Sequence, residues 1–390
     1  MTRVFALLFL VFALAAPPAA RAQLGVPLPE VPSVGGVLNQ ANQVGEQVER
    51  PLQDLRRLQV RELLRTHRRE LEADPSGMPI VRSQILALGM SAASIEQARA
   101  RGFQIVRTDA LDGDASMVTL RAPAGMSTRR ALRRLREADP EGVYDFDHLH
   151  FESGVALDVV AVAQSGAASG PRVGLIDSGV GNGVQVSMQR AFATEAPVAG
   201  AHGTTIAGLL SSAAPGARIY AADIYGGAPT GGASSALARA LSWLASENVA
   251  VINVSLVGPR NRVVEAVVAR LVSRGFVIVA AVGNDGPAAA PLFPAAYEGV
   301  VGVTAVDARD RVLVEAGRGP QVDFAALGVQ GQVRGTSYAA PIVAAQLAAA
   351  LPSPSGASAQ SVIAAMRNHA RDLGARGRDD IYGYGLISSP

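Results

Sequence analysis

Cysteine is absent from this chain of 390 residues. Disulfides are therefore excluded, and a fold in an oxidising compartment would depend on packing alone. Lysine is absent too: all 35 basic residues are arginine, which we interpret as coding bias rather than as mechanism. The net charge is only +2, so the composition gives no support to nucleic-acid binding.

Apolar runs long enough to span a bilayer comfortably are also missing. The run at residues 4–16 follows Arg3 and precedes Ala20-Arg21-Ala22, which has the small-x-small pattern of a cleavage site. Because the run is short, we interpret residues 1–22 as a cleaved signal peptide, with an uncleaved N-terminal anchor as the minor alternative. The sequence thus predicts an exported protein, either periplasmic or secreted.

The chain does have 49% apolar residues and enough length for two or three folding units. Residues 23–75 come first and are interpreted as a Pro/Gly-rich linker followed by a helix. Leucines recur at helical spacing from Pro51 to about Ala73, and arginines line the opposite face. This pattern favours a solvated helix packed on its own protein; contact with anionic lipid is the less favoured alternative.

Residues 76–152 have a different pattern. Strands are predicted at residues 83–88, 103–109, 116–123 and 143–151, and helices at residues 91–102 and 127–140. The resulting order β-α-β-β-α-β predicts a small α+β domain of the split-βαβ type. Residues 153–171, rich in Gly, Ala and Ser, follow as a linker and as the boundary between domains.

Residues 172–390 alternate between short apolar runs and helical stretches. The runs, at residues 172–176, 218–225, 249–256, 276–282 and 299–306, are typical of parallel strands buried on both faces. Helices are predicted at residues 203–212, 232–248 and 262–274, and again after Ser337. We therefore expect a three-layer α/β domain with a mostly parallel sheet.

Polar residues in this domain follow the predicted strands. Asp177 ends the first strand, and Asn284 comes directly after the fourth. Functional groups in parallel sheets gather beyond the carboxyl ends of the strands, so a site is expected there. A buried carboxylate such as Asp177 would be costly unless it is paired or well hydrogen-bonded.

Ser337 is placed by the proline that follows it. Pro341 has no N–H, so we expect it in the first turn of a helix and Ser337 at or just before the helix N-terminus. That place suits a helix cap, and it equally suits a nucleophile whose reaction creates an oxyanion. His202, in a helix of glycine and small residues, is the base that could accompany it, although a core histidine would fit the same pattern.

Three stretches resemble, in this order, the active-site boxes of the subtilisin-like (subtilase, S8) serine peptidases. They are "GLIDSGV", "HGTTIAG" and "RGTSYAAP". "VINVSLVGP" is similar to the substrate-binding strand of that family, "VAAVGNDGP" to its oxyanion segment, and "DLGARGRDDIYGYGLI" to its C-terminal pattern. The resemblance covers residues 172 to about 387, and it implies a subtilisin-like fold.

The resemblance implies a role for individual residues. Asp177, His202 and Ser337 would be the catalytic triad, and Asn284 would donate to the oxyanion. An extended peptide would pair with an edge at Ser255, Leu256 and Val257, beside Gly283. The implied activity is that of a serine endopeptidase (EC 3.4.21), whose partners are peptide or protein substrates.

Two departures from the family pattern bear on substrates and metals. Val257 stands where many relatives have glycine, and Leu292 falls near the expected pocket floor, so we expect a preference for small P1 residues. No acidic cluster resembles the calcium loops of the family, so neither a metal nor another cofactor is expected. The two histidines of "DHLH", His148 and His150, are interpreted as residues of a surface strand rather than as metal ligands.

The small α+β domain resembles the I9-like N-terminal propeptides of subtilases in pattern. This implies a zymogen in which the chain's own propeptide blocks the cleft until it is cut between about Glu152 and Pro171. A retained accessory domain is the alternative.

Two other functions of the whole protein remain as alternatives: a catalytically silent peptide-binding or regulatory module with a subtilase fold, and an esterase or lipase of the α/β-hydrolase type. The latter would place its nucleophile first along the chain and within G-x-S-x-G.

Overall fold

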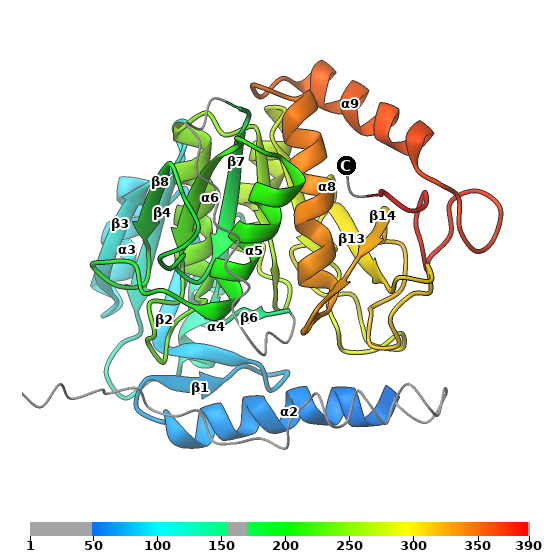
Figure 1. The fold of residues 1–390 in the computed structure, drawn as a ribbon. Helices are drawn as coiled ribbons and strands as arrows, with labels where there is room; N and C mark the ends of the chain where they lie inside the picture. The colour runs from blue at the N-terminus through cyan, green and yellow to red at the C-terminus, as the bar shows by residue number, and fades with distance from the viewer. Residues whose placement is uncertain (1–48, 154–169, 389–390) are drawn as a thin grey trace, which may run out of the picture.

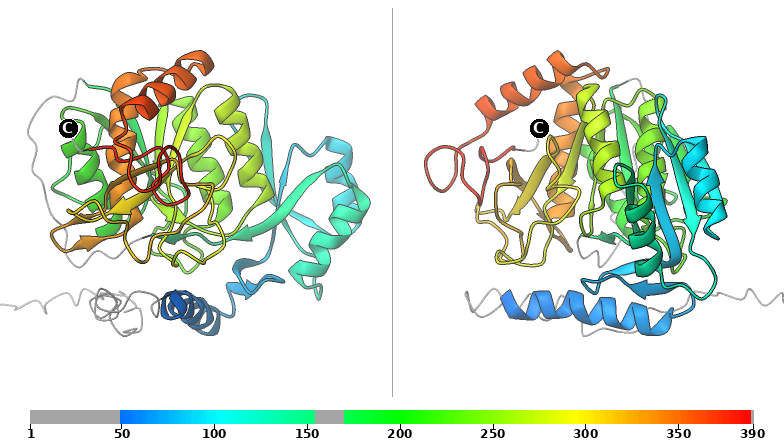
Figure 2. Two further views of the ribbon diagram at one scale, coloured as in Figure 1. Left: turned by 90° about the vertical axis from the view of Figure 1, so that its right-hand side faces the viewer. Right: turned by 180° about the vertical axis from the view of Figure 1, so that it is seen from behind.

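The computed structural model describes residues 49–153 and 170–388, with side chains from Arg56 onward. The predicted signal peptide, the linker before residue 49 and nearly all of the linker at residues 153–171 lie outside this part. The described chain forms a large α/β body with a smaller sheet at its side (Figures 1 and 2). No helix of the described residues is long and apolar enough to cross a membrane.

The smaller body has a five-stranded antiparallel sheet with the spatial order β3-β4-β2-β5, in which β1 also pairs with β2. Its elements, in chain order, are α2 (Glu49–Thr66), β1 (Leu71–Ala73), β2 (Pro79–Leu88), α3 (Ala92–Ala100), β3 (Gln104–Ala110), β4 (Ser116–Arg121), α4 (Thr128–Ala138) and β5 (Val143–His148). From β2 onward the order is the predicted β-α-β-β-α-β. Helix α4 packs against this sheet through Ala131, Leu132 and Leu135. Its arginines at positions 129, 130, 133 and 134 are exposed, whereas Arg136 donates to the carbonyl of Tyr144 on β5.

The predicted first helix is too long at its C-terminal end. It was expected to reach about Ala73, but α2 ends at Thr66, and Leu71–Ala73 is strand β1. The reason is non-local pairing: Leu71 lies opposite Val81, and its side chain is only 1% exposed. The side chain of Asp74 then accepts hydrogen bonds from the backbone N–H groups of residues 76 and 78, which closes the hairpin between β1 and β2.

The large body is built on a seven-stranded sheet, parallel throughout, with the order β14-β13-β12-β10-β7-β9-β8. Its strands are β7 (Arg172–Asp177), β8 (Met188–Ala191), β9 (Arg218–Asp223), β10 (Val251–Val254), β12 (Val277–Ala281), β13 (Val301–Val306) and β14 (Phe324–Leu327). The remaining strands have two residues each: β6 (Phe151–Glu152), β11 (Leu256–Val257), β15 (Val329–Gln330) and β16 (Val333–Arg334).

Helices cover both faces of this sheet, which confirms the predicted three-layer α/β fold. They are α5 (Ala201–Ala213), α6 (Ser234–Ser246), α7 (Arg262–Ser273), α8 (Thr336–Ala350) and α9 (Gly356–His369). Side chains of α5, α8 and α9 share one hydrophobic cluster with the sheet, and side chains of α6 and α7 share the other. Strands β8 and β14 lie at the two sheet edges and were not predicted.

Strand β5 joins the two bodies through carboxylates at helix ends. Asp145 accepts a hydrogen bond of 2.7 Å from the backbone N–H of Arg262, at the start of α7. Asp147 accepts from the N–H and the hydroxyl of Ser235, at the start of α6, at 2.9 and 2.7 Å. Because the N-terminus of a helix carries partial positive charge, both contacts are favourable, and they fix the direction in which the chain leaves β5.

Candidate functional site

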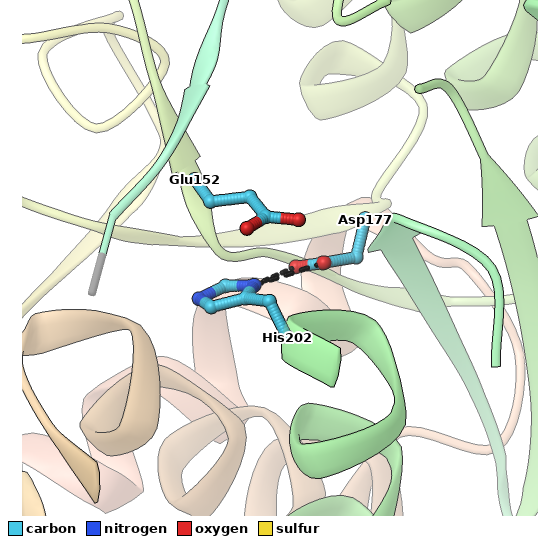
Figure 3. Close-up of side chains that lie close together, drawn as sticks. All are labelled: Glu152, Asp177 and His202. Atoms are coloured by element: carbon cyan, nitrogen blue, oxygen red, sulfur yellow. Dashed lines mark hydrogen bonds and ion pairs between the residues drawn. The ribbon is translucent and has the colours of Figure 1, made fainter. Parts of the chain in front are cut away.

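Asp177 and His202 are brought together at the carboxyl edge of the large sheet. Asp177 is the last residue of β7, and His202 is the second residue of α5. The Nδ1–H of His202 donates to both carboxylate oxygens of Asp177 at 2.9 Å, as Figure 3 shows. The N–H and hydroxyl of Ser178 also donate to Asp177, at 2.7 and 3.1 Å, so this fully buried carboxylate is well satisfied.

The close approach of α5 to β7 depends on glycine. A Cβ atom on Gly203 would lie 2.0 Å from the carbonyl oxygen of Ser178, which is backbone and has little freedom to move. Only a residue without a side chain lets the first turn of the helix approach the strand end this closely. The glycine after His202 therefore sets the position of the imidazole beside Asp177.

Ser337 is the second residue of α8, and Gly335, with φ 140°, is the residue before that helix. The prediction for Pro341 needs correction, because it lies in the second turn and not in the first. A proline there leaves the carbonyl of Ser337 without its usual helical donor. The hydroxyl of Ser255 replaces that donor, at 3.0 Å from the Ser337 carbonyl oxygen. Ser255, expected only to bind substrate, thus also supports the helix that carries Ser337.

The hydroxyl of Ser337 does not bond to His202 in this structure. It donates to the carbonyl oxygens of Ser153 and Ser255, the latter at 3.1 Å. The Nε2 atom of His202 is buried and has no hydrogen-bond partner among the described residues. The ring of Tyr338, the residue after Ser337, lies next to the imidazole, with 5.6 Å between the ring centroids.

The carbonyl oxygen of Ser153 lies at the donor site that was expected around Asn284, and the sequence did not predict that this residue would occupy it. It accepts a hydrogen bond of 2.8 Å from Nδ2 of Asn284 and one of 3.1 Å from the backbone N–H of Ser337. Asn284 is held in this orientation because its Oδ1 accepts from the N–H of Thr336 at 3.0 Å. Two N–H donors that converge on one carbonyl oxygen, next to a serine hydroxyl, are the arrangement that acyl transfer requires.

Residues 149–153 reach this point as an extended strand between two edges of the large body. On one side, β6 pairs antiparallel with β11, with Glu152 opposite Leu256 and Phe151 opposite Val257. The N–H of Ser153 continues that ladder to the carbonyl of Ser255 at 3.3 Å. On the other side, the N–H of His150 donates to the carbonyl of Gly232 at 2.8 Å. The cleft therefore binds an extended chain by strand addition.

Two side chains limit the space next to Gly283. A Cβ atom on Gly283 would lie 2.6 Å from Cδ1 of Leu292 and 3.5 Å from Cγ1 of Val257. Gly283 comes directly before Asn284, whose amide holds the Ser153 carbonyl. Leu292 and Val257 therefore take up space where a long side chain next to that carbonyl would have to lie.

Glu152 adds a second negative charge to the site. Its carboxylate and the ligand atoms of Asp177 and His202 lie within 4.8 Å of one another (Figure 3). Burial alone lowers the pKa of His202, but the charge and hydrogen bond of Asp177, together with the charge of Glu152, outweigh it and raise this pKa to about 9. Loss of hydration around its carboxylate and the charge of Asp177 raise the pKa of Glu152 in turn, against the opposing effect of His202, although the residue as a whole remains exposed. Among the described residues, Glu152, Asp177 and His202 form a group with side chains of the kinds that bind metal ions. His202 and Asp177 are already hydrogen-bonded to each other.

His148 and His150 are not on the surface as predicted. Both are buried, at 4% and 1% exposure. His148 lies between Asp74 and Asn261, whose side chains are 3.3 and 3.0 Å from its two ring nitrogens. The Nδ1–H of His150 donates to the carbonyl of Gly232 at 3.1 Å, and burial lowers the pKa of this imidazole to about 4.

Comparison with known proteins shows which family this chain resembles. The model of the Subtilase family, Peptidase_S8, matches residues 169–385. Subtilisin Savinase of Lederbergia lenta is 30% identical over 247 residues, which cover 57% of this chain and 90% of that protein. Minor extracellular protease Epr of Bacillus subtilis (strain 168) is 27% identical over 241 residues, which cover 55% of this chain but only 37% of Epr.

A solved structure supports the fold. Fervidolysin from Fervidobacterium pennivorans, described as a keratinolytic enzyme related to subtilisin, has a TM-score of 0.63 with this chain. The match covers 79% of this chain and 60% of fervidolysin at 18% sequence identity, so it bears on the fold alone.

Proposed function

Because the chain belongs to the subtilase family of serine endopeptidases, we propose that Asp177, His202 and Ser337 are its catalytic triad and that Asn284 completes the oxyanion hole. The observation that carries the proposal is the Ser153 carbonyl, which accepts from both Asn284 Nδ2 and the Ser337 N–H. These are the two donors that a tetrahedral oxyanion would need.

The proposed mechanism begins at Ser337. The Ser337 hydroxyl turns from its carbonyl acceptors to Nε2 of His202, gives up its proton and attacks the substrate carbonyl carbon. Asp177 holds the imidazole so that Nε2 is free to take the proton, and it stabilises the imidazolium that results. The same proton then passes to the leaving amine, and water hydrolyses the acyl-enzyme in a second round.

The strand at residues 149–153 also supports a zymogen. Its last described carbonyl, that of Ser153, lies in the donor site and in contact with the Ser337 hydroxyl. The bond presented to Ser337 is therefore the one between Ser153 and Gly154, within the range expected for processing. In this proposal the smaller body is an inhibitor that is cut from the peptidase by the peptidase itself. Export is part of the proposal and rests on residues 1–22 together with Epr, which is named as an extracellular protease.

The test is N-terminal sequencing of the mature protein after labelling with a fluorophosphonate probe. We expect one labelled species that begins at Gly154 and carries the probe on Ser337. If the probe does not label the protein, the peptidase proposal is wrong and the alternative function, a peptide-binding module with a subtilase fold, is favoured. A labelled protein that begins elsewhere would keep the peptidase and reject the cut after Ser153.

Small P1 residues should be preferred by the mature enzyme. Ser153, the residue in the P1 position of the bound strand, is small, and Leu292 and Val257 narrow the space beside Gly283. Forcing a large ring into such a pocket costs roughly 1–3 kcal/mol, so an alanine anilide should be hydrolysed about tenfold faster than the phenylalanine analogue. Leu292→Ala should reduce or reverse this ratio. A faster phenylalanine substrate with the unchanged enzyme would contradict the assignment of the pocket.

Self-cleavage should rise with pH and respond to Glu152. His202 acts as a base only when neutral, and its pKa of about 9 means that the cut becomes faster up to about that pH. Glu152→Gln removes one of the two charges that raise this pKa, so the profile of rate against pH should move to lower pH. At pH 7 the variant should cut itself faster than the original chain, measured on gels over time. A profile that does not move would show that Glu152 does not influence the base.

A further inference from the structure

The arginine-rich helix α2 has no part in the proposed chemistry, yet it runs along the bound strand. In Figure 1 it lies beneath β1 and β6, and the turned view in Figure 2 shows it again below the large body. Three sets of contacts connect its described side chains with the cleft.

The first contact joins the helix to the peptidase body. Nε and Nη2 of Arg56 lie 2.8 Å from Oδ1 of Asp285, and the two side chains are only 17% and 14% exposed. Asp285 follows Asn284, the amide that holds the Ser153 carbonyl. Because the pair is largely shielded from water, removal of one partner leaves a poorly solvated charge behind.

The second contact reaches the bound strand itself. The guanidinium carbon of Arg56 lies 5.5 Å from the ring centroid of Phe151, within the range of a cation–π contact. Phe151 pairs with Val257 across the cleft and precedes Ser153 by two residues. One arginine therefore touches both the bound strand and the body that binds it.

The third contact is apolar and lies further along the helix. Leu63 and Leu64 of α2 and Phe151 pack against one hydrophobic cluster. The buried members of that cluster come from the small sheet, from the approach to the cleft and from the start of α6: Leu71, Val81, Leu149 and Ala233. The helix thus joins the inhibitor body, the bound strand and the peptidase.

We propose that Asp285 and the face of the Phe151 ring that contacts Arg56 form a docking site for helix α2, and that the docked helix keeps the bound strand in the cleft after the Ser153–Gly154 bond is cut. The proposal rests on the self-cleavage proposed above and assigns the helix a later step. Cutting creates a new carboxylate at Ser153. The strand is then held in the cleft by the short β-ladder between β6 and β11. The Arg56–Asp285 pair adds a connection that the cut does not break, so release of the strand limits the appearance of activity.

The test uses the full-length chain and follows two signals after refolding: the cut chain on a gel and hydrolysis of an alanine anilide. With Arg56→Ala, the cut should form at its usual rate, and the delay between cut and activity should become about tenfold shorter, equivalent to ~1.4 kcal/mol. Arg61→Ala, at an exposed arginine of the same helix, is the matched control and should keep the original delay. Equal delays in the two variants would overturn the proposal.

A charge exchange separates docking from a general loss of structure. Arg56→Glu should shorten the delay, and adding Asp285→Arg to it should lengthen the delay again because the pair is restored with reversed sign. A double variant no slower than Arg56→Glu alone would argue against a specific pair.

Hydrogen exchange decides the case in which no variant is cut. In full-length Ser337→Ala protein, amides of residues 56–66 should exchange faster when Arg56→Ala is added and unchanged when Arg61→Ala is added. Absence of any cut in chains with Ser337 would reject the proposed self-cleavage, and with it the retention of a cut strand, but it would leave the docking of α2 at Asp285 to be decided by the exchange rates. Identical exchange in the two variants would reject the docking site alone.

Discussion

Replacement of Ser337 by alanine is expected to abolish both self-cleavage and peptide hydrolysis. The loss in kcat should be about a millionfold, because the serine and histidine of such a triad act as one unit. Among the residues that the structure describes, the hydroxyl bonds only to the carbonyls of Ser153 and Ser255, so the fold should survive its removal. The measurement is the size of the purified chain over days, together with fluorophosphonate labelling.

The matched control is Ser273→Ala, which removes a hydroxyl that bonds to the carbonyl of Arg270 at the end of α7. This variant should mature and accept the probe like the original chain. A purified Ser337→Ala chain that still shortens itself at the Ser153–Gly154 bond would mean that another group, or another enzyme, performs the cut.

Replacement of Asn284 by aspartate should lower kcat by about 10²–10³ with little change in KM. The amide donates to the Ser153 carbonyl at 2.8 Å through Nδ2, while its Oδ1 accepts from the Thr336 N–H. Aspartate keeps an acceptor for the Thr336 N–H but has no hydrogen to donate to the oxyanion. The effect falls on kcat because the hydrogen bond from Asn284 becomes stronger only as negative charge develops on the oxygen in the transition state. Steady-state kinetics on an alanine anilide measure the effect.

Asn284→Ala should give a loss of the same order, and Asn368→Ala, on the exposed face of α9, should have no effect. An increase in KM with kcat unchanged would instead show that Asn284 binds substrate and transition state equally, as a residue of the cleft rather than of the oxyanion hole.

The sheet was predictable where its strands are buried on both faces. Strand β12 consists of buried apolar residues and β10 of buried residues that are apolar except Asn253, and such runs are visible in the sequence alone. Edge strand β8 alternates between exposed and partly buried residues over only four positions, so it carries no such run. Its place is determined by pairing with β9, a non-local contact.

The site was predictable to the extent that it lies in local motifs. The carboxylate and imidazole of Asp177 and His202 meet as their boxes suggested. What the motifs did not contain are partners from distant segments. Ser153 reaches the Ser337 N–H across more than 180 residues, and His150 is buried because Gly232 lies against it. The pattern of hydrophobic residues around Ser153 and His150 does not indicate the contact of either residue with its distant partner.

The carboxylates of Asp145 and Asp147 have a consequence for the peptidase after it is cut. As long as β5 is in place, the first turns of α6 and α7 have anionic partners, each contributing about 0.3–1 kcal/mol. If the smaller body leaves as proposed, these amides must turn to solvent, and the peptidase loses contacts that helped to define its native state. A mature enzyme derived in this way would owe its lifetime to a high barrier against unfolding rather than to a large free-energy difference, and once denatured it would regain its shape only slowly.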